Sequence, residues 1–219
     1  AIADVYRGNS PMTGHIARKV VQYFNQRGGL GTDVEKLSQR EREVLEHLAR
    51  GGSYKEIAAL GRLTGRSERA AELIGHAKRS LDRIEERVRP IPAEKRPGVY
   101  YMWAQGPLET SCGESTVEDL IRLAGARNVC ASIPNEHLVV NMERILSWNP
   151  DLIVMWYNSR LDPEDLARES PWQAVAAVRN GRVHELPDVF LCDLWTLKFS
   201  CAVRTVATWS HPELFRDTD

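Results

Sequence analysis

Aromatic and charged side chains follow short apolar runs in the second half of the chain. Aromatic rings stack on planar ligands, and a guanidinium group opposes acidic groups on a ligand. These residue types therefore predict a small-molecule binding site, although Trp103 and Trp156 would also suit the underside of a helix. The candidate ligand-binding residues are Tyr101, Trp103, Trp156, Tyr157, Arg160, Asp193 and Trp195.

The cysteines and histidines show no spacing typical of a metal site. The absence of a C-x-x-C pair excludes a zinc ribbon and a thioredoxin-like motif. We expect buried free thiols at Cys112, Cys130, Cys192 and Cys201, because unpaired cysteine behaves as a small hydrophobic residue. A Cys112–Cys192 disulfide or soft-metal pair is the alternative.

No Ser, Cys or carboxylate lies in a recognisable catalytic motif, and the six histidines are scattered along the chain. Nucleophilic catalysis needs a base and an orienting group beside the nucleophile, and a catalytic zinc needs grouped ligands. We therefore predict no catalytic residue, no metal ligand and no enzymatic activity.

The elements that would position these side chains lie in residues 97–219, where short β-rich runs alternate with capped helical runs. That alternation is typical of a parallel sheet with crossover helices. Ligands of open α/β sheets bind beyond the carboxyl ends of the strands, so the loops after Ala104, Trp156 and Leu186 are the expected site. The predicted strands are 99–104, 138–140, 152–156 and 182–186, with the apolar run 152–156 central.

Capping residues predict the helices of the same region. Ser115 begins an S-x-x-E capping box, and Asn141 can cap the helix that follows it. Ser170-Pro171 places proline at a first helical position, and a last helix is expected over 193–209. The predicted fold class is α/β, a three-layer parallel-sheet lobe preceded by an all-helical N-terminal segment and a long helix.

Residues 1–96 are helical in pattern. Capping boxes at Ser38 and Ser53 predict two short helices, and a longer helix is expected over 67–88, ended by Pro90. The predicted domains are 1–60, 61–96 and 97–219. The apolar stripe of the long helix consists of Ala70, Ile74, Ala77, Leu81, Ile84 and Val88, spaced by four or three residues.

Charge is distributed unevenly along the chain. Residues 1–96 hold 19 Lys and Arg against 13 Asp and Glu, a net charge of +6, whereas residues 97–219 carry −7. A basic half can approach nucleic acid, and a solvated helix face gives the same count. No run reaches the ~20 apolar residues of a membrane span and no secretory signal opens the chain, so we expect no membrane insertion, and the compartment stays unknown.

The long helix and the region after it resemble a class III, or helical-backbone, periplasmic substrate-binding protein. Five segments carry the resemblance in family order: Gly61 to Arg66 with Ala70 to Ile74, Glu118 to Val129, Met142 to Leu146, Asn149 to Val154, and Pro171-Trp172 with Ala176 to Val183. The resemblance covers about 61–219 and implies the spanning helix and C-terminal lobe of such a protein.

The resemblance implies a ligand, a partner and a docking residue. In that family two α/β lobes hold a metal chelate, such as a siderophore, haem or corrinoid, for an ABC importer. Glu143 matches the glutamate of the family's E-x-I-L segment, where surface acids engage the importer; alternatively, it favours the helix N-terminus through the dipole. Only one lobe is matched, so we expect weak binding and no cofactor beyond a bound chelate.

Residues 1–58 resemble the linker and the start of the helix-turn-helix of a LuxR-type response regulator. The matching segments are Ser10 to Val21, Leu37 to Leu45 and Lys55 to Ala58. The chain then looks like a chimera joined near Ala58 to Gly61, and two apolar faces left without their usual partners can pair, within one chain or in a swapped homodimer. A DNA-binding alternative uses Lys55, Ser67, Arg69, Lys78 and Arg79, and an inactive chimera, natural or engineered, is a third possibility.

Overall fold

The computed structural model describes residues 54–158, 160–188 and 191–216. They divide into two compact units, one of residues up to Ala77 with Trp195–Leu197, the other of Lys78–Leu194 with the residues from Lys198 onward. The helix predicted after Ser38, the Ser53 cap and most of the regulator-like segment lie outside the described residues.

The first unit contains a helical hairpin. Helix α5 (Tyr54–Leu63) ends in a Schellman motif, in which the Arg66 N–H donates to the Gly61 carbonyl at 2.6 Å and Gly65 takes a positive φ of 69°. Helix α6 (Ser67–Val88) begins directly afterwards, with the predicted bounds. A Cβ on Gly61 would lie 2.5 Å from the Ala70 Cβ, so glycine permits the close approach of the two helices.

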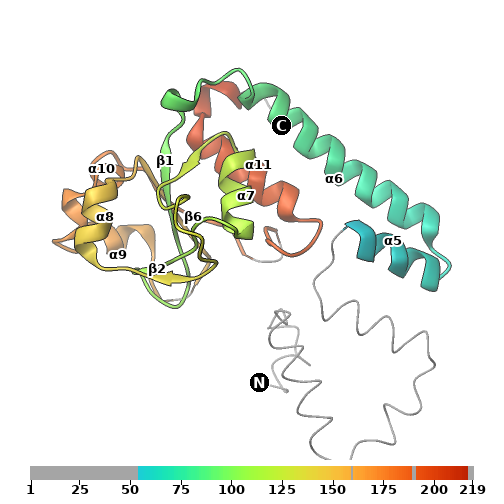
Figure 1. Ribbon diagram of the computed structural model, residues 1–219, viewed down its shortest axis with the longest axis horizontal. Coiled ribbons are helices and arrows are strands. Elements are labelled where there is room, and N and C mark those ends of the chain that lie inside the picture. The colour runs from blue at the N-terminus through green and yellow to red at the C-terminus, as the bar shows by residue number, and fades with distance from the viewer. Residues whose placement is uncertain (1–53, 159, 189–190, 217–219) are drawn as a thin grey trace, which may run out of the picture. The chain divides into compact units, whose positions relative to one another are not determined.

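The second unit is built on a four-stranded parallel sheet in the order β3-β1-β5-β6 (Figure 1). Its strands are β1 (Gly98–Met102), β3 (Arg127–Asn128), β5 (Leu152–Met155) and β6 (Val183–Glu185). In the central pair, Val99 lies opposite Leu152 and Met102 opposite Met155. The carboxyl ends of β1 and β5 therefore coincide at one edge of the sheet.

Two apolar cores cover the two faces of this sheet, because successive side chains of a strand point to opposite faces. Val99, Tyr101, Leu152 and Val154 enter one core, and the alternate residues of both strands enter the other. The first core is covered by the end of α6, α7 (Thr116–Leu123) and α11 (Phe199–Ser210). The second is covered by α8 (Met142–Trp148), α9 (Pro163–Arg168) and α10 (Ala176–Arg179), which lie on the other side of the sheet from α7 and α11 in Figure 1.

The predicted α/β class and parallel-sheet lobe are confirmed. Two predicted caps are present: Ser115 Oγ accepts the Glu118 N–H at 3.1 Å, and Asn141 Oδ1 accepts the Arg144 N–H at 2.9 Å. Three short 3-10 turns complete the unit: η1 (Ala93–Lys95), η2 (Trp172–Ala174) and η3 (Pro212–Leu214).

Three predicted elements differ in the structure. Residues 138–140 were expected in the parallel sheet, but β4 (Leu138–Val139) pairs antiparallel with β2 (Glu109–Thr110) in a separate two-stranded ribbon. The helix expected from Ser170 is only the single turn η2, because its backbone turns extended again at Val175. The last helix begins at Phe199 and not at Asp193. The parallel edge position is taken by β3, which is only two residues long and was not predicted.

Candidate functional site

Two tryptophans lie side by side where the central strands end. Trp103 follows β1, Trp156 follows β5, and the Trp156 N–H donates to the Met102 carbonyl at 2.8 Å, which continues the strand pairing by one residue. Their ring centroids are 5.7 Å apart at an interplanar angle of 52°. Both side chains are partly buried.

Tyr101 is fully buried and is not available to a ligand in this conformation. It has the same parity along β1 as Val99 and therefore points into the core under α7 and α11. Its ring meets Trp103 edge-on at 4.9 Å between centroids, so it supports the tryptophan from beneath. Burial, with a smaller effect of Cys192, raises the pKa of the Tyr101 hydroxyl well above its usual value.

The loop after β5 is organised by Asn158, which is not among the candidate ligand-binding residues of the sequence. Its side-chain oxygen accepts the backbone N–H groups of Arg160 at 3.0 Å and Leu161 at 2.9 Å. Asparagine commonly closes turns in this way, which is the signal that would have identified it. Within the same loop the side chain of Tyr157 is 43% exposed, and that of Arg160 is also exposed.

Glu185 ties this loop to the end of β6. Its Oε1 accepts the Asn158 backbone N–H at 2.9 Å. Burial raises the pKa of the Glu185 carboxyl, Asp162 and Glu164 raise it further, and the hydrogen bond from Asn158 partly opposes them. Glu185 was not predicted as a site residue, because its partner is 27 residues away in the chain.

The loop after β1 is held on both sides. The Tyr100 hydroxyl donates to the Pro107 carbonyl at 3.0 Å, and burial followed by the charge of Glu109 raises its pKa. On the β2–β4 ribbon, Glu109 lies 2.6 Å from the His137 ring nitrogen. The ribbon thus closes the loop against the segment that follows β3.

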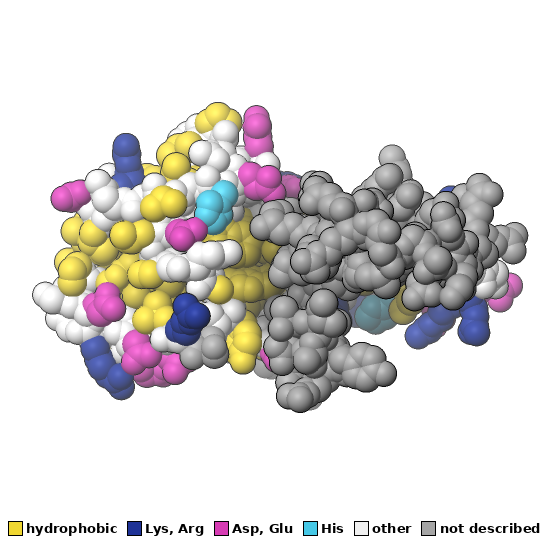
Figure 2. Space-filling view, turned by 90° about the horizontal axis from the view of Figure 1, so that it is seen from below, with side chains coloured by type: hydrophobic (Ala, Val, Ile, Leu, Met, Phe, Trp, Pro, Cys, Tyr) yellow, Lys and Arg dark blue, Asp and Glu magenta, His cyan; other side chains and the backbone are white. Residues whose placement is uncertain are grey.

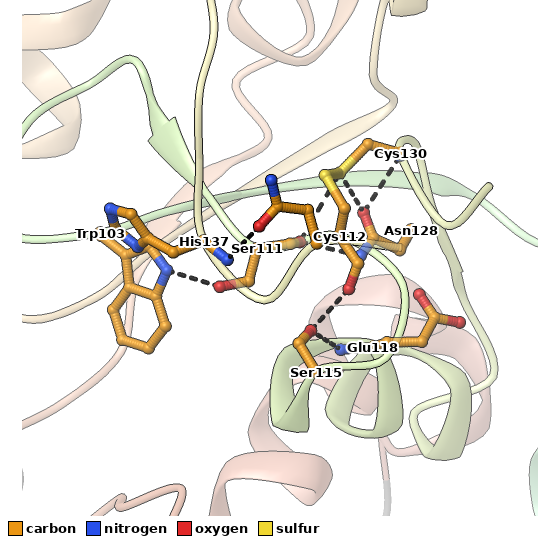
Figure 3. Close-up of a disulfide and its surroundings, with 9 residues drawn as sticks. Trp103, Ser111, Cys112, Ser115, Glu118, Asn128, Cys130 and His137 are labelled. Atoms are coloured by element: carbon orange, nitrogen blue, oxygen red, sulfur yellow. Dashed lines mark hydrogen bonds between the residues drawn. A yellow bond between two sulfur atoms is a disulfide. The ribbon is translucent and has the colours of Figure 1, made fainter. Parts of the chain in front are cut away.

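Cys112 and Cys130 form a disulfide, with sulfur atoms 2.02 Å apart (Figure 3). The expectation of free thiols is therefore wrong for these two residues, and so is the Cys112–Cys192 pair. Cys192 is free and buried, as expected, whereas the free Cys201 is exposed. The sequence did not identify the pairing because β3, which pairs with β1 and ends two residues before Cys130, was itself not predicted.

The remaining candidate residues belong to both units. Asp193 is partly buried within the second unit, and Trp195, 41% exposed, belongs to the first. Glu143 is exposed at the second position of α8. Because α8 leads into the amino end of β5, its first turn faces the same edge of the sheet as the tryptophan pair.

The residues of the DNA-binding alternative lie on two helices. Lys55 is in α5, and α6 carries Ser67, Arg69, Lys78 and Arg79. Arg69 is ion-paired with Glu72 at 2.7 Å on the exposed surface. Helix α6 continues without a break into the α/β unit, unlike a short recognition helix that lies free in a DNA groove.

An apolar area covers the face of the α/β unit toward which β1 runs. Figure 2 views this face and shows hydrophobic side chains with charged groups and a histidine around them. Partly buried Trp103, Leu108, Trp156 and Leu161 belong to the loops of this edge. Across the described ranges, no group of three or more His, Cys, Asp or Glu is placed to hold a metal ion, and no helix is long and apolar enough to cross a membrane.

The chain matches a protein-family model over most of its length. The family model described as Periplasmic binding protein matches residues 30–189. The match begins well before residue 61, where the resemblance in the sequence was placed, and so includes part of the segment that resembles a response regulator.

The chain is also similar to curated binding proteins. The high-affinity heme uptake system protein IsdE of Staphylococcus aureus (strain Newman) is 26% identical over 145 residues, which are 63% of this chain and 49% of IsdE. The chain thus spans about half the length of the curated relatives it matches.

Two solved structures show the shared fold. CeuE of Helicobacter pylori in complex with Ni-His has a TM-score of 0.64 and 21% identity, covering 74% of this chain and 52% of CeuE. MolA of Haemophilus influenzae bound to molybdate has a TM-score of 0.65 and 20% identity, covering 76% of this chain and 51% of MolA.

Proposed function

The chain belongs to the periplasmic binding protein family, and from that premise we propose that its α/β unit binds a small metal chelate for an ABC importer. The observation that carries the proposal is the Trp103–Trp156 pair at the coincident ends of the two central strands. Open α/β sheets bind ligands at this edge. The similar proteins include a haem uptake protein and a protein in complex with Ni-His, which supports the ligand class.

The surroundings of the pair suit a planar, largely apolar ligand. The two indole rings supply flat surface, and the exposed Tyr157 and Arg160 lie on the adjoining loop. Aromatic side chains stack on such ligands, and a guanidinium pairs with peripheral carboxylates. In this proposal Trp103 and Trp156 contact the ligand, whereas Tyr101 acts only by supporting Trp103.

Equilibrium binding tests the proposal. Ferric haem, cobalamin, a ferric siderophore and Ni(II)–histidine are titrated into the 219-residue chain, with molybdate as a compact oxyanion for comparison. We expect dissociation constants in the micromolar range or above, because a chain of half the relatives' length covers little of a ligand. Submicromolar affinity would contradict this half-site argument, and no binding of any probe would contradict the proposed function.

A pair of substitutions locates the site. Trp156→Leu removes one ring of the pair and is expected to weaken binding of the best probe by about tenfold. Trp148→Leu is the control, since Trp148 ends α8 and packs on the opposite core near Tyr100, at 6.5 Å between rings. Equal effects of the two substitutions would place the ligand elsewhere.

Docking to the importer is a further part of the proposal, with Glu143 as the contact residue. The DNA-binding, swapped-dimer and inactive-chimera alternatives stay predictions without a supporting observation among the described residues. Binding of random duplex DNA that weakens steeply with rising salt concentration would support the DNA-binding alternative. The mass of the protein in solution tests the swapped-dimer alternative.

A further inference from the structure

The indole of Trp103 is held by a hydrogen bond from inside the protein. Its Nε1–H donates to Ser111 Oγ at 2.8 Å. Figure 3 shows the two side chains turned toward each other, with the disulfide directly beyond Ser111. Ser111 is 1% exposed, so water does not replace this acceptor without opening the loop. The polar edge of the indole is thereby fixed inward, and its orientation is defined by Ser111.

Ser111 is in turn held by the segment that follows β3. The Asn128 side-chain amide donates to the Ser111 carbonyl at 3.0 Å, and Asn128 Oδ1 accepts the Cys130 N–H at 3.2 Å. The Cys112–Cys130 disulfide joins the same two segments covalently. These four residues, Ser111, Cys112, Asn128 and Cys130, are at most 2% exposed, so the hydrogen bonds and the disulfide that join the two segments are buried.

Further contacts keep the two segments in one register. The Cys112 N–H donates to the Asn135 carbonyl at 3.1 Å, and the Gly113 N–H to the Ile133 carbonyl at 2.9 Å. A Cβ on Gly113 would lie 2.3 Å from the Ala131 carbonyl oxygen, so the backbones approach as closely as glycine allows. A slip of this register would carry Ser111 away from Trp103.

We infer that Ser111 is a positioning residue for the ligand-facing indole of Trp103, and that the Cys112–Cys130 disulfide holds Ser111 in place, so that ligand binding depends on the intact disulfide. The inference rests on the proposed function for its ligand half. An unpartnered indole N–H would turn toward solvent or toward the ligand, and the stacking surface presented beside Trp156 would change with it. The disulfide thereby links ligand affinity to an oxidising environment.

The first test needs no ligand. The chain has six tryptophans, and the indole N–H resonance of Trp103 is identified by its loss in Trp103→Phe. Ser111→Ala is expected to shift this resonance and speed its hydrogen exchange at least tenfold, whereas Ser111→Thr, which keeps the hydroxyl, restores both. The paired substitution Cys112→Ala/Cys130→Ala is expected to reproduce the shift.

Ser115→Ala is the matched control. Ser115 is also buried beside the disulfide and donates to the Cys112 carbonyl at 2.6 Å, but it does not touch Trp103. It caps α7, so its loss lowers stability without removing the indole acceptor. An unmoved Trp103 resonance in Ser111→Ala or in the paired cysteine variant would overturn the inference, as would an equal shift in Ser115→Ala.

The second test uses ferric haem, or the tightest probe from the titrations above. Ser111→Ala and the paired cysteine variant are expected to weaken binding about tenfold, and Ser111→Thr to restore it. Unchanged affinity in variants whose indole resonance has moved would overturn the ligand half of the inference. If the wild-type chain binds no probe, both the proposed function and the predicted effect of the disulfide on ligand binding are wrong. The indole resonances still test whether the disulfide positions Trp103.

Discussion

Glu185 at the end of β6 is a residue whose charge works against folding. Its raised pKa means that the folded protein holds the proton more tightly than the unfolded chain, so stability falls as pH rises from the usual glutamate range through the raised value. Glu185→Gln keeps an acceptor for the Asn158 N–H and removes the charge.

We therefore expect Glu185→Gln to raise the melting temperature by about 1–3 °C at pH 7 and to leave it unchanged below about pH 4. Melting curves recorded against pH check this. Glu185→Ala is the comparison, since it removes the acceptor and is expected to melt lower at every pH. If the melting temperatures of wild type and Glu185→Gln coincide at every pH, the charge of Glu185 does not destabilise the folded protein.

Glu143 tests the importer part of the proposed function at the same scale. Its exposed carboxylate lies in the first turn of α8, toward the tryptophan edge. Charge reversal by Glu143→Lys is expected to weaken docking to the importer of the source organism at least fivefold, by turning an attraction to importer arginines into repulsion. Docking is measured on the importer reconstituted in lipid vesicles.

The stability of the Glu143→Lys variant is measured in parallel, because the Glu143 carboxylate also stabilises α8 by about 0.5 kcal/mol through its interaction with the helix dipole. Glu169→Lys is the control, since Glu169 caps the carboxyl end of α9 and so lies toward the opposite edge of the sheet. Equal docking by both variants would leave Glu143 with the helix-dipole role alone.

At the scale of elements, the turn after α7 sets how closely α6 approaches the sheet. Gly125 has a φ of 77° and ends α7 in a Schellman motif. A Cβ there would lie 2.5 Å from the Val88 Cβ, whereas a Cβ on Gly181, in the equivalent turn after α10 with a φ of 63°, would meet nothing within 4 Å. Substitution of Gly181 therefore measures the free-energy cost of the left-handed backbone alone, whereas substitution of Gly125 adds the cost of overpacking against Val88.

Gly125→Ala is expected to lower the free energy of unfolding by about 2–4 kcal/mol, the sum of left-handed strain and overpacking. Gly181→Ala is expected to cost only the strain, about 1–2 kcal/mol. Denaturant unfolding of both variants provides the measurement. A similar loss in both would mean that Val88 moves aside freely and that α6 is not tightly packed at its end.

At the scale of the whole molecule, the helical hairpin of the first unit is expected to open as one cooperative piece. Hydrogen exchange should protect α5 and residues 70–77 together, and less strongly than the buried strands β1 and β5. Gly61→Ala drives a Cβ into Ala70 and is expected to remove protection from both helical segments at once.

Gly65→Ala is the matched control, because a Cβ there has open space and adds only the left-handed strain of a φ of 69°, so it should reduce protection less. Protection of β1 and β5 is expected to stay unchanged in both variants. Because α5 and α6 close within one chain, light scattering should give the mass of a single chain. A mass of two chains, or independent exchange of α5 and residues 70–77, would contradict this picture.

Local signals in the sequence determined much of the architecture. The caps at Ser115 and Asn141, the bounds of α6 and the apolar strand β5 were all predicted, because a cap or a helical stripe acts within a few residues of itself. The structure brings the loops after β1 and β5 to one edge of the sheet, as expected, since β1 and β5 are parallel neighbours. Tyr101, a candidate ligand-binding residue, is buried because alternate side chains of β1 face the core.

Only the tertiary structure decided how the site is held. The Cys112–Cys130 disulfide, the Trp103–Ser111 bond and the Glu185–Asn158 bond each join residues 8–27 positions apart in the chain. Which loop meets which depends on the strand order, and two-residue strands such as β3 carry too little pattern to reveal that order. A contact between two loops has no signal in either loop alone, because it exists only once the sheet has brought their ends together.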